Sequence, residues 1–470
     1  MMTATASSSQ TALRQPPELF VIEDEKGPIL YAPLRRVMAR VNHDAVRIAL
    51  DHVDDPDSTP VLDANGQTVL EALEKHGFFE RRLYPSHEPQ FRPAQVTLFP
   101  TNRCNLRCSY CYAQGGEGGD NNEPLTVMDL AAAKRAIDLV AHNAQELAAE
   151  GLPYKNFLVS IHGNGEPFCA FDTLREIVFY AQDVSEALEF PVVLNTATNG
   201  VMDEEQLEFL AANFNNVNIS FDGLPSLQDA QRPLANGKGS FALVDRTMKR
   251  LAAAGVNFGI RATVTNAMIA RLVEITSFVA NNYPSVEQLH FEPVWECGRC
   301  VTSNDSPPTA EDFIANYLAA LEVAREKGIR LVYSGARQDM VTDAFCKVSS
   351  GSFTVTPTGD VTACYEVSYK SDPRSERYFF GRYDPELGTY VFDQKTLDAL
   401  AQLNVKNIPF CTDCFCRWHC AGDCAAKVLE GKQPQDHQGS QRCTINRRLT
   451  LNQIQRKMEW SDVDVQQQPK

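Results

Sequence analysis

The stretch TNRCNLRCSYCYAQGG, from Thr101 to Gly116, places three cysteines within eight residues. Cys104, Cys108 and Cys111 follow the spacing C-x3-C-x2-C. Three is an odd number, so a closed disulfide pair or a four-thiolate metal site would leave the group mismatched. A cubane of four irons and four sulfides on three thiolates has one iron without a protein ligand, and such an iron can bind a small chelating molecule.

The composition is that of a globular protein. The 470 residues suffice for two or three domains and a large core, and 43% hydrophobic with 22% charged residues is typical of soluble proteins. No apolar run of about 18 residues occurs, and the start, MMTATASSSQTALRQPP, lacks the apolar core of a secretory signal. We therefore predict a cytoplasmic protein with a disordered tail at residues 1–16.

Net charge and cysteine usage narrow the function classes. The formal charge of −16, without any Lys/Arg-rich run, disfavours nucleic acid and membrane as partners. Structural disulfides are rare in a reducing compartment, yet the chain has 14 cysteines, and six of them crowd the stretch from Cys411 to Cys443. Clustering of this kind indicates bound metal.

Between about residues 94 and 327, short β-branched runs alternate with long amphipathic ones. This pattern predicts βα units around a parallel sheet, here an α/β fold with a partial (β/α)6 TIM-like barrel at residues 93–330. In such barrels the chemistry lies at the carboxyl ends of the strands. The predicted strands are QVTLF from Gln95, FLVSI from Phe157, VVLNT from Val192, VNISF from Val217, GIRATV from Gly259 and QLHFEPV from Gln288, with helices from Asp129 and Thr173.

The cysteine spacing, directly after the first strand, resembles that of the radical S-adenosylmethionine (SAM) enzyme family. The resemblance implies a [4Fe-4S] cluster on Cys104, Cys108 and Cys111, with SAM on the open iron and reductive cleavage of SAM to a 5′-deoxyadenosyl radical. The alternative is a group of buried cysteines or a three-thiolate zinc site, which the later motifs disfavour.

Further residues match the family's SAM-binding positions. GNGEP resembles the family's GGEP loop, with Asn164 in place of its first glycine. The resemblance implies SAM contacts for a set of residues in the loops and on the fifth strand: Tyr110, Gly163, Gly165, Glu166, Asn199, Ser220, Asp222 and Arg261. Arg261 is the candidate for the SAM carboxylate, because a guanidinium fork suits a carboxylate. For each of these residues the alternative is a structural role, either in packing or as a buried polar group that makes its hydrogen bonds within the protein.

The C-terminal third resembles the SPASM extension of radical SAM enzymes. Cys346 begins C-x12-G-x4-C, and CTDCFCRWHCAGDC gives C-x2-C-x5-C-x3-C. The resemblance implies an iron–sulfur SPASM domain at 331–450 with two auxiliary [4Fe-4S] clusters, three clusters in all, followed by a C-terminal tail at 451–470. The first auxiliary cluster takes Cys346, Cys364 and Cys424, and the second takes Cys411, Cys414, Cys420 and Cys443. Two zinc sites are the alternative.

The fourth ligand of the first auxiliary cluster is not fixed by the match. Cys300 or Cys297, in WECGRC, supplies it by looping across, or one iron stays open. Cys416 is surplus to the pattern, and Cys169 is a lone cysteine whose usual fate is burial.

Residues 17–92 predict a small α+β domain. ELFVIEDEKGPILYAPL predicts a β-hairpin, and HDAVRIALDHV and TVLEALEKHGFFE predict amphipathic helices. Such a unit resembles the precursor-recognition domains of peptide-modifying enzymes, although a plain packing extension is an equal alternative.

The resemblance implies a peptide maturase that forms a thioether or carbon–carbon cross-link or an oxidised residue. Its partners are a peptide or protein with a leader segment and an electron donor such as flavodoxin or ferredoxin. Sulfatase-maturing relatives have an aspartate base near this position, where this chain has Tyr365 and Glu366 after Cys364, which weakens the formylglycine alternative. Glu366 and Tyr365 are the catalytic candidates, and a solvated carboxylate is the alternative for Glu366. The alternatives are an epimerase with Cys169 as hydrogen donor, a formylglycine-forming maturase, and a non-catalytic iron–sulfur protein.

Overall fold

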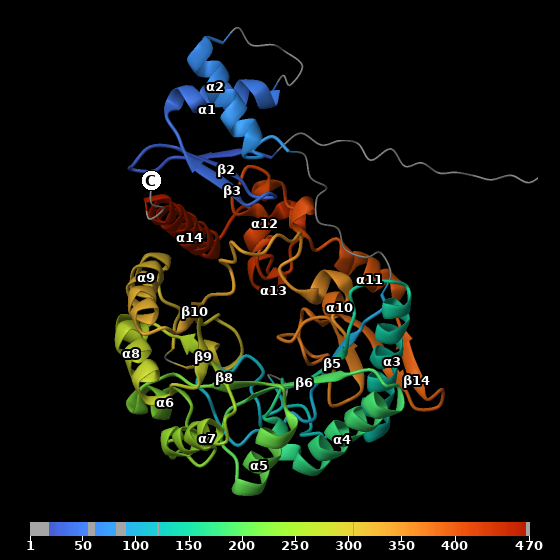
Figure 1. The fold of residues 1–470 in the computed structure, drawn as a ribbon. Helices are drawn as coiled ribbons and strands as arrows, with labels where there is room; N and C mark the ends of the chain where they lie inside the picture. Colours follow the sequence, from blue (N-terminus) through green and yellow to red (C-terminus); the bar gives the residue numbers. More distant parts are fainter. Residues whose placement is uncertain (1–17, 55–61, 81–90, 120–121, 304, 467–470) are drawn as a thin grey trace, which may run out of the picture.

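The computed structural model describes residues 18–54, 62–80, 91–119, 122–303 and 305–466, with side chains described as far as Glu459 (Figure 1). The tail predicted at residues 1–16 lies outside the described residues.

A curved sheet of parallel strands surrounded by helices forms the centre of the molecule (Figure 1). The parallel strands are β4 (Gln95–Leu98), β5 (Phe157–Ile161), β6 (Val192–Thr198), β7 (Asn216–Ser220), β8 (Phe258–Val264), β9 (Val286–Pro293) and β10 (Arg330–Val332). The helices around the outside are α3 (Leu130–Ala149), α4 (Phe171–Ala187), α5 (Glu204–Asn213), α6 (Pro225–Gln231), α7 (Phe241–Ala253), α8 (Leu272–Asn282) and α9 (Ala310–Glu326). The predicted α/β partial barrel is confirmed, with β10 as an additional strand.

The two faces of the sheet differ in burial. Along β8, Ile260, Ala262 and Val264 are buried, whereas Arg261 between them is exposed. Successive side chains of a strand point to opposite faces. Since the helices cover the outer face, Arg261 points to the inner face, where the barrel is open.

The sheet continues from the barrel into the C-terminal third. Strand β11 (Thr354–Val355) pairs in parallel with β4, on the side of β4 opposite to β5. Antiparallel pairings then add β12 (Asp360–Thr362), β13 (Phe379–Asp384) and β14 (Thr389–Phe392). The short helices of this region are α10 (Ser375–Tyr378), α11 (Gln394–Ala401), α12 (Arg417–Cys420) and α13 (Ala425–Val428).

The N-terminal unit is a separate three-stranded sheet with two helices. It contains β1 (Phe20–Ile22), β2 (Ile29–Ala32), β3 (Val37–Arg40), α1 (His43–Asp54) and α2 (Ala64–Lys75). The predicted hairpin and both predicted helices are present, with β3 as a third strand. Leu30 packs with Ala49 and Leu73 of the two helices, so this face of the sheet is covered by its own unit.

The other face of this sheet packs on α14 (Gln441–Gln466), which corrects the predicted C-terminal tail at 451–470. Ile29 and Tyr31 of β2 form a buried cluster with Ile454 and Met458 of α14. The sequence analysis missed this helix because its apolar residues, although helically spaced, are separated by Arg, Gln and Asn.

Within the described residues, no helix combines the length and apolar character needed to cross a membrane.

Candidate functional site

The three cysteines of the opening stretch lie on a loop directly after β4. Backbone N–H groups point at two of their sulfurs: Leu106 N lies 3.5 Å from Cys104 Sγ, and Gly115 N lies 3.5 Å from Cys111 Sγ. A tight turn joins Cys108 to Cys111, because Cys111 N donates to Cys108 O at 3.2 Å. N–H groups aimed at sulfur stabilise a thiolate in an iron–sulfur site, so the loop fits such a group.

These thiols share one buried environment. Burial raises the pKa of Cys108 to about 12 and that of Cys104 well above its usual range. The neighbouring Cys108 and Cys111 raise the pKa of Cys104 further, since negative charges on adjacent thiols repel. A bound metal would reverse this balance, because metal ligation stabilises the thiolate form.

The GNGEP loop packs against the cysteine loop without room for side chains. A Cβ on Gly165 would lie 2.1 Å from Arg103 O, and one on Gly163, whose φ is +120°, would lie 2.0 Å from the Phe99 ring. A Cβ on Gly115 would likewise lie 2.9 Å from Asn164 O. The glycines therefore bring the two loops into direct backbone contact.

Glu166 joins the loops that follow β5 and β6. Its carboxylate is buried and accepts hydrogen bonds from Thr198 Oγ1 at 2.6 Å, Asn199 N at 2.7 Å and Phe168 N at 3.4 Å. Burial raises its pKa to about 7, against the effect of these three donors. Asn199 in turn donates to Asn105 Oδ1 at 2.7 Å and lies 3.8 Å from Cys104 Sγ, so this chain of contacts ends at the cysteine loop.

Asp222 lies beneath the cysteine loop and is fully buried. It accepts hydrogen bonds from Tyr110 Oη, from Gln231 Nε2 at 2.8 Å and from Thr263 N at 3.3 Å, and Arg232 Nε lies 3.1 Å away. Both carboxylate oxygens are thus engaged by the protein, and Asp222 positions Tyr110. Sequence reasoning missed Gln231 and Arg232, because an isolated Gln-Arg pair carries no motif.

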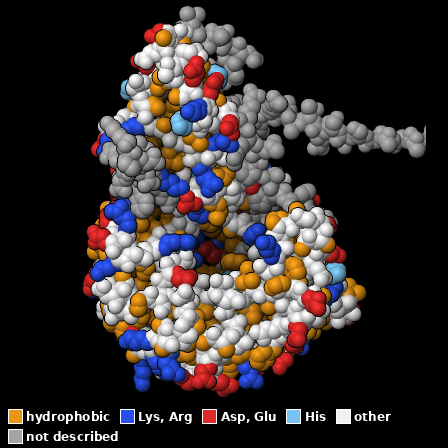
Figure 2. Space-filling model, in the orientation of Figure 1, with side chains coloured by type: hydrophobic (Ala, Val, Ile, Leu, Met, Phe, Trp, Pro, Cys, Tyr) orange, Lys and Arg blue, Asp and Glu red, His pale blue; other side chains and the backbone are white. Residues whose placement is uncertain are grey.

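The inner face of the barrel carries polar side chains in register. Ser220 of β7 is paired with Arg261 of β8, and Arg261 with His290 of β9. No ion pair to Arg261 is found in the part of the chain that the structure describes. Figure 2 shows the molecule hollowed near its centre, with charged side chains at the rim of the hollow. Arg261 therefore offers a positive charge, without an ion-pair partner among the described residues, to the inner face of the barrel.

The stability of the protein is expected to depend on pH through His162, which follows β5. Burial, and secondly Arg261, lower its pKa to about 4, below the 6.5 of an unfolded chain. The unfolded chain binds the proton more readily, so protonation of His162 opposes folding at low pH. The protein keeps its full stability above pH 6.5 and loses about 2 kcal/mol of its free energy of unfolding through His162 by pH 5. Urea unfolding at pH 7 and pH 5 should show a smaller loss for His162→Gln than for the unsubstituted protein. Equal losses would contradict the assignment.

The cysteines predicted for the first auxiliary cluster lie together. Cys346 raises the pKa of Cys364, and both raise that of Cys424, in each case after burial and Glu366. Glu366 Oε1 lies 3.1 Å from the buried Lys427 Nζ, whereas its Oε2 is buried without a hydrogen-bond partner among the described residues. The unpaired oxygen leaves Glu366 able to accept a proton or hydrogen bond from a further group.

Tyr365 lies at the junction of barrel and C-terminal region. Its ring meets that of His162 edge-on, with centroids 4.8 Å apart, and its hydroxyl lies 3.2 Å from Thr97 Oγ1 of β4. The side chain is 38% exposed. The Tyr365 side chain thus contacts strand β4 of the barrel, while the adjacent Glu366 faces the first auxiliary set.

The cysteines predicted for the second auxiliary cluster also lie together. Cys411, Cys414 and Cys443 each raise the pKa of Cys420, after burial and Asp423. Cys414 differs, since hydrogen bonds from Cys416 and Arg447 lower its pKa to about 6, and Arg447 Nε lies 3.4 Å from its sulfur. This set therefore includes one thiol that is readily ionised.

Arg337 supplies a buried donor between the two auxiliary sets. Its Nη2 is buried without a hydrogen-bond partner among the described side chains, whereas Nε and Nη1 donate to His419 O and Phe345 O. Cys420 of the second set and Cys346 of the first are among the groups that act on its pKa, which burial lowers. An unpaired buried donor beside both sets fits clusters whose sulfurs accept hydrogen bonds.

Two other cysteines have protein contacts of their own. The Cys416 thiol is buried and lies 3.8 Å from Asn446 O. Cys169 follows the GNGEP loop, and burial, followed by Glu166, raises its pKa to about 11. Among the residues described, no three His, Cys, Asp or Glu side chains form a group that could hold a single metal ion.

The thiols of Cys300 and Cys297, the two candidates for the remaining ligand, differ in their surroundings. The Cys300 thiol donates to Asp305 O at 3.6 Å and packs with Tyr110 and Val294 in a small core. Cys297 has no described thiol hydrogen bond, and after burial its pKa responds most to Glu366 and then Lys427, which also flank Cys424. Cys297 and Cys300 therefore both stay candidates for the remaining ligand, and they differ in that the Cys300 thiol is engaged by a backbone carbonyl.

Substituting these two cysteines is expected to separate them. Cys297→Ser should change the Mössbauer spectrum of the first auxiliary cluster and lower the bound iron from about twelve toward about eight per chain. The matched variant Cys300→Ser should retain the full iron content. The reverse result would return the ligand to Cys300, and no change in either protein would indicate an open iron.

Residues 98–271 match the family model described as the Radical SAM superfamily. This stretch covers the cysteine loop, the GNGEP loop and the strands β5 to β8. The chain therefore contains a radical SAM domain, and the cysteine loop lies in that domain.

Two relatives show how far the similarity extends. An uncharacterized protein of Methanocaldococcus jannaschii is 30% identical over 184 residues, or 39% of this chain. This chain spans 57% of that relative's length, less than two thirds. The mycofactocin maturase MftC of Mycobacterium ulcerans is 26% identical over 371 residues, covering 74% of this chain and 88% of the relative.

Two solved structures share the fold. The structure of anSMEcpe with bound AdoMet has a TM-score of 0.58 and 17% identity, and covers 78% of this chain and 99% of that one. Streptococcus suis SuiB bound to the precursor peptide SuiA has a TM-score of 0.53 and 13% identity, and covers 90% of this chain and 98% of that one. At these identities the likeness concerns the fold alone.

Proposed function

We propose that this protein is a radical SAM enzyme that modifies a peptide, forming a cross-link or an oxidised residue. The observation that carries the proposal is the cysteine loop of the radical SAM domain, packed on the GNGEP loop at the open end of the barrel. The similarity to a maturase over 74% of the chain supports a peptide substrate.

The residues fit the cofactors that this function requires. Cys104, Cys108 and Cys111 would hold a [4Fe-4S] cluster, and the two auxiliary sets would hold two more. When bound, SAM and the first cluster supply a 5′-deoxyadenosyl radical, which can take a hydrogen atom from carbon.

The chain's own residues hold the reacting groups in place. Arg261 would pair with the SAM carboxylate from the inner face, and Ser220, its neighbour in register, would contact the same ligand. Tyr110 and Asn199 fix the cysteine loop through Asp222 and Asn105. Glu166 joins the loops after β5 and β6.

Glu366 would be the base that removes a proton from the substrate. Its Oε2 has no described partner, whereas Lys427 holds Oε1 and keeps the carboxylate oriented. Tyr365 would line the approach to the barrel beside β4. An external electron donor such as flavodoxin or ferredoxin would supply the electron that starts the reaction.

Anaerobic reconstitution tests this function. With dithionite and SAM, we expect about twelve irons per chain and formation of 5′-deoxyadenosine by mass spectrometry. Incubation with a peptide encoded beside this gene should remove two hydrogens per cross-link or oxidation. About four irons and no nucleoside would contradict the proposal.

An epimerase is the second candidate, for which Cys169 is the hydrogen donor. It leaves the peptide mass unchanged in water and adds one deuterium in heavy water. The same incubation therefore distinguishes the two reactions.

A further inference from the structure

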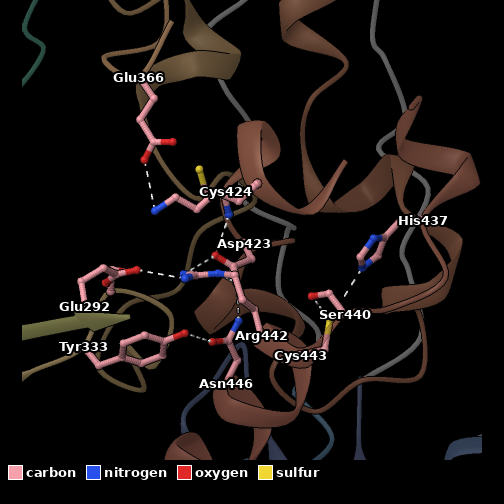
Figure 3. A network of polar contacts seen from close by, with 12 residues as sticks. Glu292, Tyr333, Glu366, Asp423, Cys424, His437, Ser440, Arg442, Cys443 and Asn446 are labelled. Atoms are coloured by element: carbon pink, nitrogen blue, oxygen red, sulfur yellow. Dashed lines mark hydrogen bonds and ion pairs between the residues drawn. The ribbon is translucent and has the colours of Figure 1, made fainter. Parts of the chain in front are cut away.

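A buried network of charges lies between the two auxiliary cysteine sets (Figure 3). Its centre is Arg442 of α14, which is 5% exposed. Arg442 contacts Asp423 through Nε at 2.8 Å and Nη2 at 3.0 Å, and Glu292 Oε1 through Nη1 at 3.0 Å. Such a forked pair fixes direction as well as charge.

Both members of the Arg442–Asp423 pair adjoin a cysteine of an auxiliary set. Asp423 precedes Cys424 of the first set, and Asp423 Oδ1 accepts the Cys424 backbone N–H at 2.6 Å. Arg442 precedes Cys443 of the second set. The pair therefore ties the two sets to each other.

The backbone beside this pair is strained. Ala421, Gly422 and Asp423 have φ values of +51°, +79° and +62°, between Cys420 of the second set and Cys424 of the first. Left-handed conformations are unfavourable for residues other than glycine. Asn446 also donates to Asp423 Oδ2, at 2.9 Å, so the contacts of Asp423 hold this turn in place.

The charge of Asp423 acts on both sets. Asp423 lies in the turn between Cys420 of the second set and Cys424 of the first, with its Oδ1 2.6 Å from the Cys424 backbone N. Arg442 compensates this charge through its two contacts with the Asp423 carboxylate. Charges in a buried site interact strongly with any group that gains or loses an electron there.

We propose that Arg442 and Asp423 are positioning residues shared by both auxiliary clusters, and that their charges set the reduction potentials of the two clusters together. The inference rests on the proposed function, because it requires both clusters to be bound. Arg442 lowers the cost of adding an electron at each site, and Asp423 raises it.

Opposite charge changes test the proposal in the reconstituted full-length protein. Arg442→Gln removes a positive charge, so both auxiliary potentials should fall in a dithionite titration followed by electron paramagnetic resonance. Asp423→Asn removes a negative charge, and both potentials should rise. A merely structural role would instead cause loss of iron or broadened signals in both variants, without opposite shifts.

Arg447 provides the matched control. It lies on the same helix, but its Nε contacts Cys414 Sγ of the second set, and its guanidinium lies over the Phe410 ring. Arg447→Gln should therefore move only the second potential. Should Arg442→Gln fail to fold, Arg442→Lys and Asp423→Asn keep the test intact, since Lys retains the charge and should shift the potentials less than Asn does.

The outcomes separate this inference from the proposed function. A shift confined to one cluster, or the same sign of shift in Arg442→Gln and Asp423→Asn, would overturn the inference at full iron content. Only about four irons in the unsubstituted protein would overturn the cluster assignment and the inference together.

Discussion

Replacing Cys108 with alanine is expected to reduce formation of 5′-deoxyadenosine by at least about 1000-fold, as is usual when a group essential to the chemistry is removed. Cys108 is central in the loop, joined to Cys111 by a turn, and its thiol is buried. Two cysteines cannot hold the cluster in the geometry that the loop provides. The measurement is anaerobic incubation with SAM and dithionite, with the nucleoside quantified by mass spectrometry.

Iron content makes this prediction specific to one site. Cys108→Ala should keep about eight irons per chain, because both auxiliary sets lie elsewhere in the fold. Cys169→Ala is the control, since it removes a thiol close to Glu166 that the proposed cross-linking reaction does not use. Undiminished nucleoside formation in Cys108→Ala would remove the cysteine loop from the proposed function.

Asp222→Ala is expected to lower the free energy of unfolding by about 3–5 kcal/mol, the cost of leaving one member of a buried ion pair alone. Asp222 is fully buried, and Arg232 is 7% exposed. Its loss would leave the Arg232 guanidinium unpaired and the Tyr110 hydroxyl without its acceptor. Urea unfolding followed by circular dichroism measures the change.

A double variant separates the charge effect from simple loss of packing. Asp222→Ala with Arg232→Met should be more stable than Asp222→Ala alone, because no unpaired charge remains buried. If the double variant is as unstable as the sum of the single changes, the ion pair does not account for the loss.

Much of the barrel could be predicted from the sequence. Its strands are β-branched runs that are bounded by turns. The buried face of each strand is the one that the helices following in the sequence cover. Strand β10 was missed because only three residues, Arg330–Val332, form it, and its pairing with β9 comes from tertiary structure.

The predicted cluster ligands come from the spacing of the cysteines, and their role as ligands stays a prediction. The cysteines of each auxiliary set lie together although the first set spans Cys346 to Cys424. Single charged residues were beyond this reasoning, because Lys427 and Arg442 belong to no motif. Their importance arises only when folding removes them from water beside acidic partners.

The pairing of β11 with β4 has a consequence for how the chain matures. Strand β4 leads into the cysteine loop, and one of its edges is completed only by Thr354 and Val355, far along the chain. Contacts between such distant segments form slowly, and unpaired strand edges favour aggregation. During synthesis this edge of β4 is expected to stay unpaired until Thr354 and Val355 have left the ribosome, so the sheet that carries the cysteine loop is completed only late in translation.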